Sequence, residues 1–210
     1  MFPRFASMKS KTRKQRFRQL QAVVSQDLNA SIIELAQEYL RDFPKAGLVW
    51  LDYGNALVNF ARYDEARAAL LRSIKYTRSE YKYFPYCSMG NLYERKGDYR
   101  RAAEWFGKAA KITPADATYL IFLGAVFVKA GKLSEAMKCY RRAVKCKEGA
   151  IDEAYYNLGV ILGALGRYKE ALTWLEKALQ IDPKYKLAKQ AAKDMRRVLD
   201  IKATSNKALN

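Results

Sequence analysis

The chain has 210 residues, half of them apolar, so it can bury a substantial core as one large or two small domains. It carries 39 Lys and Arg against 21 Asp and Glu, and this net charge of +18 favours anionic partners or surfaces without specifying a fold. The absence of histidine removes the commonest general base and metal ligand, and no apolar run is long enough to span a bilayer.

The amino-terminal segment is strongly basic. Cations recur from Arg4 to Arg18, whereas the first acidic residue is Asp27. A charge run of this kind usually forms a solvated surface, and contact with RNA or the ribosome and a mitochondrial presequence are the alternatives. Because the run continues into a segment that predicts helices, we expect a cytoplasmic protein. Residues 1–12 are predicted to form a flexible tail.

Residues 13–46 predict a first pair of helices that closes at Pro44. The segment follows the outline of the units further along the chain, but it has Leu20 where they have glycine and Ile32 where they have alanine. We interpret it as a degenerate first repeat, as terminal repeats commonly are.

Four full units follow, at 47–82, 83–116, 117–151 and 152–183. Four glycines recur at spacings of 36, 34 and 35 residues, which is the period of a helical solenoid. They are Gly54, Gly90, Gly124 and Gly159. An alanine lies twelve residues after each of them, and a large apolar residue lies four residues beyond the alanine, giving the pairs Ala66 and Leu70, Ala102 and Phe106, Ala136 and Tyr140, Ala171 and Leu175.

These small residues are expected where two antiparallel helices cross, with the alanine as the contact opposite the first glycine. A second glycine column, Gly97, Gly131 and Gly166, has Ala61 in the first full unit. It is expected to end the first helix of each unit, because a helix carboxyl cap requires a residue that tolerates positive φ.

The carboxyl-terminal segment, residues 184–200, is amphipathic. It places Ala188, Ala191, Ala192, Met195 and Leu199 on one face, and we expect a helix that covers the last repeat. Residues 201–210 are predicted to be a flexible tail.

This set of columns resembles the tetratricopeptide repeat (TPR) family, whose pattern is W-x2-L-G-x2-Y, then A-x3-F, then P. The resemblance covers residues 47–183. It implies an all-α fold, a right-handed superhelical solenoid of antiparallel helix pairs, here with a carboxyl-terminal capping helix.

The resemblance also implies that the first helices of successive units line a concave groove that binds a peptide or helix of a partner protein. Helix periodicity then selects the groove residues, and an apolar groove of this extent is typical of a binding site. Gly163 matches no column and is expected to relieve packing in the groove wall. The predicted groove residues are Leu48, Leu51, Asn55, Val58, Asn59, Phe84, Cys87, Asn91, Glu94, Thr118, Ile121, Ala125, Val128, Tyr156 and Val160.

One TPR sub-family grips the terminal carboxylate of chaperone tails with Lys, Asn, Asn, Lys and Arg. The matching positions here are Leu51, Asn55, Ser88, Thr118 and Phe122. Only Asn55 agrees, so no chaperone-tail clamp is expected.

The second helices carry two columns of cations. Together they predict a basic convex face able to meet phosphate or an acidic protein. The residues are Arg72, Lys75, Lys108, Lys111, Arg142, Lys145 and Lys177.

No nucleophile–base pair or phosphate-binding loop is present, so we expect a non-enzyme without cofactor or metal. The function predicted is an adaptor, scaffold or assembly factor that binds an unidentified protein or peptide, with self-association of the apolar groove as a second outcome and a groove without a partner as a third. The alternative is an RNA- or ribosome-associated protein that uses the basic face.

Overall fold

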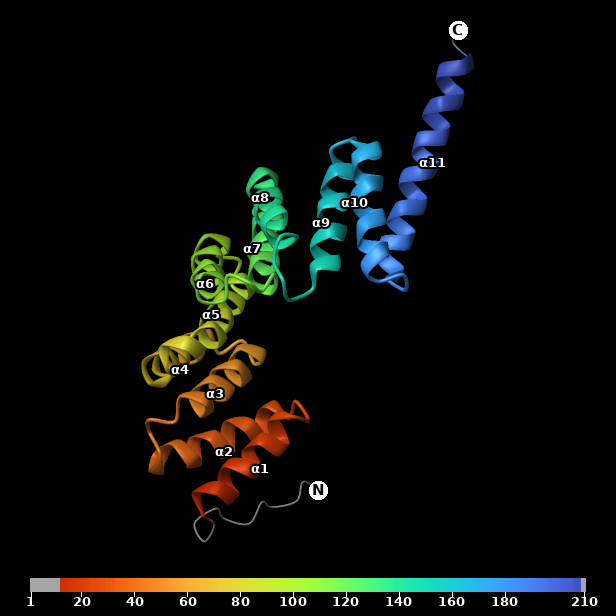
Figure 1. The fold of residues 1–210 in the computed structure, drawn as a ribbon. Helices are drawn as coiled ribbons and strands as arrows, with labels where there is room; N and C mark the ends of the chain where they lie inside the picture. Colours follow the sequence, from red (N-terminus) through yellow and green to blue (C-terminus); the bar gives the residue numbers. More distant parts are fainter. Residues whose placement is uncertain (1–11, 209–210) are drawn as a thin grey trace. The chain divides into compact units, whose positions relative to one another are not determined.

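A computed structural model describes residues 12–208, which are α-helical apart from short connections and contain no strand (Figure 1). The chain divides into two compact units, Met1–Asp98 and Tyr99–Asn210. The predicted all-α fold is confirmed. The predicted tail at 1–12 lies outside the described residues except for Thr12.

In the first unit each helix packs on the helix that follows it, and α3 also contacts α5. The repeated pairing of neighbouring helices is that of a solenoid. The elements are α1 (Arg13–Val24), α2 (Asn29–Asp42), α3 (Gly47–Asn59), α4 (Tyr63–Tyr76), the 3-10 turn η2 (Ser79–Tyr81) and α5 (Tyr83–Arg95).

The second unit continues the same arrangement, with α6 against α7, α8 against both α7 and α9, and α10 between α9 and α11. The division between the units falls between the two helices of the predicted repeat at 83–116. The elements are α6 (Tyr99–Ile112), α7 (Thr118–Lys129), α8 (Leu133–Ala143), α9 (Ile151–Ala164), α10 (Tyr168–Ile181) and α11 (Lys186–Ala208).

Helix α1 begins at a capping box. The Thr12 hydroxyl accepts a hydrogen bond from the Gln15 amide, and the Gln15 side chain accepts one from the Thr12 amide. One turn on, Arg16 is buried and pairs with Asp42 at the end of α2. The basic run predicted to be a solvated surface is therefore partly structural.

The first glycine column lies at close crossings of paired helices. A Cβ on Gly124 would lie 2.6 Å from the Tyr140 ring, and one on Gly159 would lie 2.6 Å from Leu175 Cγ. These nearest neighbours belong to the large-residue column on the second helix, whereas the expected contact with the alanine column is found at Gly159, whose Cβ would lie 3.1 Å from the Ala171 carbonyl oxygen. The four alanines are fully buried.

The second glycine column ends the first helices, as predicted. Gly97, Gly131 and Gly166 have φ between 72° and 75°, and the amide of the following residue bonds to a carbonyl five residues back. This is the Schellman motif. The same hydrogen-bonded motif ends α3 and α1. There, Ala61 (φ 57°) and Asp27 (φ 53°) occupy the left-handed position although neither is glycine.

Helix α11 packs on α10 and α9 and buries Ala188 and Ala192. It continues to Ala208, so the predicted helix end at 200 is too early. Gly163 of α9 faces this helix, because a Cβ there would lie 2.9 Å from Met195 Sδ. Its predicted place in the groove wall is therefore wrong, and it serves close packing against the capping helix.

Candidate functional site

The fifteen predicted groove residues differ in exposure. Leu48 is 53 % exposed and Phe84 45 % in the first unit, and Val160 is 42 % exposed and Val128 39 % in the second. The asparagines Asn55, Asn59 and Asn91 are also exposed, and six residues are half-buried, namely Leu51, Cys87, Glu94, Thr118, Ala125 and Tyr156.

Two predicted groove residues are core residues. Val58 is 5 % exposed and Ile121 is 2 % exposed, so neither offers a surface to a partner. The prediction for these two residues is wrong, because helix register fixes the face on which a residue lies, whereas burial depends on the side chains of neighbouring helices.

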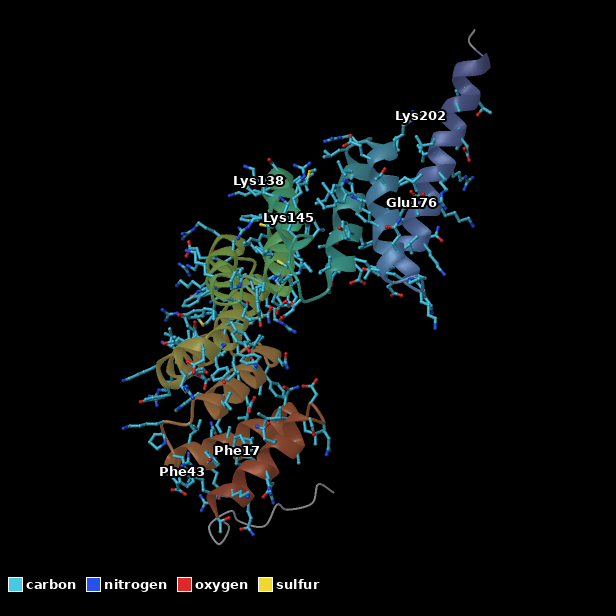
Figure 2. All side chains as sticks on the ribbon, viewed as in Figure 1. Phe17, Phe43, Lys138, Lys145, Glu176 and Lys202 are labelled. Carbon is cyan, nitrogen blue, oxygen red and sulfur yellow. The ribbon has the colours of Figure 1, made fainter. Side chains whose placement is uncertain are left out.

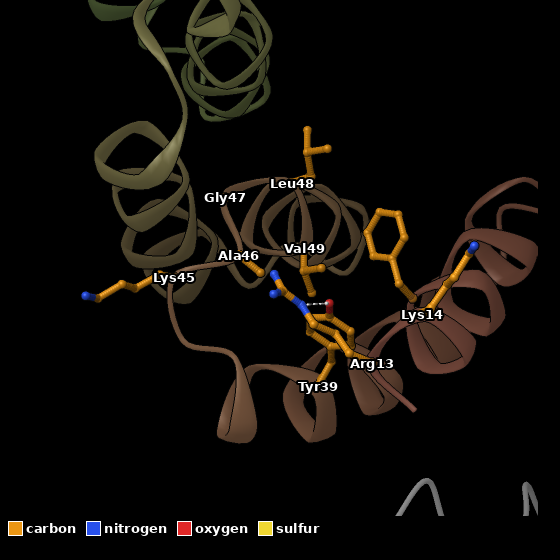
Figure 3. Close-up of a pocket in the computed structure, with 9 residues that line it drawn as sticks. Arg13, Lys14, Tyr39, Lys45, Ala46, Gly47, Leu48 and Val49 are labelled. Atoms are coloured by element: carbon orange, nitrogen blue, oxygen red, sulfur yellow. Dashed lines mark hydrogen bonds between the residues drawn. The ribbon is translucent and has the colours of Figure 1, made fainter. Parts of the chain in front are cut away.

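A pocket of about 560 Å³ opens where α1 and α2 meet the start of α3, and we call it the Phe17 pocket. Figure 3 shows Lys14 and Lys45 reaching outward on opposite sides of it, and the Arg13 guanidinium donating a hydrogen bond to the Tyr39 hydroxyl at 3.3 Å. It is lined by Arg13, Lys14, Phe17, Tyr39, Lys45, Ala46, Gly47, Leu48 and Val49.

The Phe17 pocket draws on the degenerate repeat, which the sequence prediction left out of the groove. Phe17 lies three residues before Leu20, as Leu51 lies three before Gly54, so the same register would have found it. Its ring lies 6.2 Å from that of Tyr39, and Tyr39 lies 4.9 Å from Phe43 at the end of α2, centroid to centroid. Figure 2 labels Phe17 and Phe43 in this part of the chain.

A second pocket, of about 420 Å³, lies where α3, the end of α4, η2 and α5 meet, and we call it the Phe84 pocket. Its walls are mainly apolar and aromatic, with one cation. It is lined by Gly47, Leu48, Tyr76, Thr77, Arg78, Tyr81 and Phe84.

The second unit has a smaller pocket of about 210 Å³, the Val160 pocket, formed by α7, α8 and α9. Three of the predicted groove residues, Ala125, Val128 and Val160, come together in it. The remaining lining residues are Lys129, Tyr140, Asn157 and Ile161.

The start of α3 is held firmly between its neighbours. The buried Ser73 hydroxyl donates to the Gly47 carbonyl at 2.8 Å, and the Trp50 indole donates to the Pro44 carbonyl at 2.8 Å. These bonds hold the connection from α2 and the first turn of α3 in place, and Leu48 belongs to that turn.

Burial raises the pKa of two titratable groups on the first helices. Desolvation raises the pKa of the Cys87 thiol to about 11, which disfavours a nucleophilic or metal-binding thiolate. Burial also raises the pKa of Asp52 to about 6, opposed by a hydrogen bond from the Gln21 side chain at 3.0 Å. Among residues 12–208 no cluster of His, Cys, Asp and Glu could hold a metal ion.

The predicted basic face is largely exposed, but several of its cations cover aromatic rings. The Arg72 guanidinium carbon lies 4.7 Å from the Trp50 ring centroid, and Lys108 Nζ lies 3.7 Å from that of Trp105. Lys177 lies 4.5 Å from Trp174 in the same way. Part of this charge therefore serves packing. Lys75, Lys111, Arg142 and Lys145 are exposed, and Figure 2 labels Lys145 together with Lys138 in this part of the chain.

Comparison with known families agrees with this geometry. Residues 33–80 and 87–151 match one family model of the tetratricopeptide repeat, and residues 152–185 match another. The chain therefore belongs to the tetratricopeptide repeat family. Among residues 12–208, no helix combines the length and apolar composition that a membrane span requires.

Curated relatives share only part of their length with this chain. It is 29 % identical over 117 residues to small glutamine-rich tetratricopeptide repeat-containing protein 2 of Mycosarcoma maydis, covering 56 % of this chain and 33 % of that protein. It is 32 % identical over 93 residues to the peroxisomal targeting signal receptor of Candida glabrata, covering 44 % and 16 %. The chain thus spans a third or less of these relatives.

Solved structures show the same fold. MamA (residues 41 to the end) from Desulfovibrio magneticus RS-1 matches with a TM-score of 0.68 at 16 % identity, covering 84 % of this chain and 98 % of that one. YrrB, described as a TPR protein with an unusual peptide-binding site, matches with a TM-score of 0.64 at 18 % identity, covering 89 % and 95 %.

Proposed function

We propose that this protein binds a peptide or helix of another protein on its first helices and acts as an adaptor, scaffold or assembly factor. The observation that carries the proposal is the exposure of large apolar side chains beside pockets in both units, at Leu48 and Phe84 and at Val128 and Val160. Exposed apolar surface beside a pocket is typical of a binding site.

Apolar pockets of this kind favour recognition of side chains. Asn157 adds an amide to the Val160 pocket, where it could hydrogen-bond a ligand backbone. Two of the similar proteins are named for a bound signal or peptide, namely the peroxisomal targeting signal receptor and YrrB. Their names support the same class of ligand here.

Other readings have less support. Three cations of the predicted basic face cover tryptophan rings, which weakens the case for an RNA-binding back. A chaperone-tail clamp would place its third polar residue at Ser88, which is buried. The high pKa of Cys87 gives no support to catalysis at the groove.

A selection from a random peptide display library on the whole chain tests the proposal. Selected peptides should bind the native chain and lose about tenfold or more in affinity when Leu48 and Val128 are both changed to Asp, because a peptide bound in either unit loses an apolar contact. Selected peptides that contain no acidic residue should change little in affinity in about 0.5 M salt.

The matched control is Leu71→Asp with Ile181→Asp, since both residues are large, apolar and exposed but lie on second helices. Peptides that bind the control as poorly as the groove variant, with all proteins equally folded by circular dichroism, would refute the proposed site.

A further inference from the structure

The Phe17 pocket and the Phe84 pocket share two residues, Gly47 and Leu48, at the first turn of α3. Resting on the function proposed above, we propose that the two pockets together bind an internal acidic segment of a partner protein. One large apolar side chain of the segment enters each pocket, and carboxylates on the segment face the surrounding cations.

The charges of the lining residues carry the acidic part of this inference. Arg13, Lys14 and Lys45 line the Phe17 pocket and Arg78 lines the Phe84 pocket, whereas none of the described residues lining either pocket is acidic. Arg78 already pairs with exposed Glu80 at 2.6 Å. Lys14 and Lys45 are exposed and take part in no salt bridge among residues 12–205, so they are the main attraction for a carboxylate.

The apolar side chains in the walls of the two pockets support the second part of the inference, that large apolar side chains of the segment are bound. Phe17 and Leu48 are the accessible apolar side chains of one pocket, whose Val49 is fully buried, and Leu48, Tyr81 and Phe84 border the other. Each pocket has room for a side chain the size of leucine or phenylalanine, at about 560 and 420 Å³. Leu48, about half exposed, is the shared wall that both ligand side chains would contact.

The shared floor is rigid and closely packed. A Cβ on Gly47 would lie 2.8 Å from Thr77 Oγ1 and 2.9 Å from the Tyr76 carbonyl, so only glycine lets α3 start this close to the end of α4. The buried hydrogen bond from Ser73 to the Gly47 carbonyl holds the same contact. A preformed site loses little conformational entropy on binding.

Charge and ring geometry distinguish an acidic protein segment from two other candidates for the two pockets, the start of this chain and a nucleic acid. Residues 1–11 of this chain contain Arg4, Lys9 and Lys11 and no acid, so they do not complement the cations. Base stacking requires open ring faces, but Phe84 packs on Tyr83 with centroids 4.2 Å apart and Phe17 lies beside Tyr39. An acidic protein segment therefore fits better than the chain's own start or a nucleic acid.

The test uses synthetic peptides with a common dye and an amidated carboxyl end, so that no terminal carboxylate is present. Each carries two leucines separated by one, two or three residues in a background of Glu, Gly and Ser. For each peptide there is a partner with Gln in place of Glu and another with Ser in place of one leucine. Binding to the full chain is measured by fluorescence anisotropy at low salt.

We expect at least one acidic two-leucine peptide to bind. Its affinity should fall about tenfold or more with Gln in place of Glu and by at least about tenfold with one leucine removed. Leu48→Asp should abolish binding. Lys14→Glu with Lys45→Glu should weaken it, whereas the charge-matched exposed pair Arg18→Glu with Arg67→Glu, which lines neither pocket, should not.

The inference would be overturned if no acidic peptide binds, if the Gln peptides bind equally well, or if Leu48→Asp leaves binding unchanged. It would also be overturned if oligouridylate binds more tightly at the same residues, or if the chain forms a concentration-dependent dimer that Leu48→Asp dissociates. If no acidic peptide binds but library-selected peptides do and are lost on Val128→Asp, the proposed function stands while this inference fails. If both variants leave all peptide binding intact, the proposed function fails as well.

Discussion

The Tyr140 ring lies against the backbone of Gly124, and a Cβ on this glycine would be 2.6 Å from Tyr140 Cε1. Gly124→Ala should therefore lower the free energy of unfolding by about 1 to 3 kcal/mol, as overpacking of a well-packed crossing does. Gly107→Ala is the matched control, because Gly107 is also helical in the second unit and nothing lies within 4 Å of its Cβ position. The control should gain up to about 1 kcal/mol from helix propensity. Equal thermal midpoints for the two variants would contradict the assigned crossing.

The end of α3 carries backbone strain that glycine would relieve. Ala61 has φ of 57°, whereas Gly97, Gly131 and Gly166 occupy the equivalent positions in later repeats. Ala61→Gly should stabilise the protein by about 1 kcal/mol, and the reverse change Gly166→Ala should destabilise it by a similar amount. Urea unfolding of both variants measures the difference, and a shift in the same direction for both would disprove the strain argument.

Asp52 makes stability depend on pH in a definite direction. Burial raises its pKa from 3.8 to about 6, so the folded state binds this proton more tightly than the unfolded state. Its contribution is fully present below about pH 4 and is lost as the pH rises through about 6. Asp52→Asn should therefore stabilise the protein at pH 8 by up to about 3 kcal/mol, and this gain should vanish near pH 4.

Chemical denaturation of native protein and Asp52→Asn across this pH range provides the measurement. Taking the difference between the two proteins removes the contribution of the other carboxylates. A stabilisation that is constant from pH 4 to pH 8 would show that burial does not perturb this carboxyl group.

The cations on the second helices should separate into two groups. Arg72→Glu and Lys177→Glu should each cost about 1 kcal/mol, because each removes a cation held over a tryptophan ring. Lys111→Glu with Lys145→Glu should change stability by no more than about 0.5 kcal/mol, since both residues are exposed. Loss of peptide binding in this double variant at about 0.5 M salt would move the principal site to the basic face.

The repeat architecture could be predicted from the sequence because particular backbone conformations and close contacts require particular residue types at single positions. A close helix crossing requires a small residue such as Gly124, and a left-handed helix end favours Gly97, so each role is visible at one position. The exposure of the groove residues was less predictable. Ile121 and Leu51 occupy equivalent positions, yet Ile121 is buried and Leu51 is only half-buried.

The features that escaped prediction depend on contacts between distant residues. The pKa of Asp52 reflects burial at a place where Gln21 reaches it from α1. The Phe17 pocket is formed in part by the degenerate repeat. That repeat lacks the small residues by which the other repeats are aligned, so its groove positions are less readily assigned. Likewise, the need for glycine at position 163 is explained only by its close contact with Met195 of the capping helix.

Hydrogen–deuterium exchange of the full chain, with and without a library-selected peptide, tests the central claim most directly. Peptide binding on the first helices predicts slower exchange at the starts of α3 and α5, or along α7 and α9, with unchanged exchange in the first halves of α4 and α8 and in α10. Protection confined to the second helices would contradict the claim.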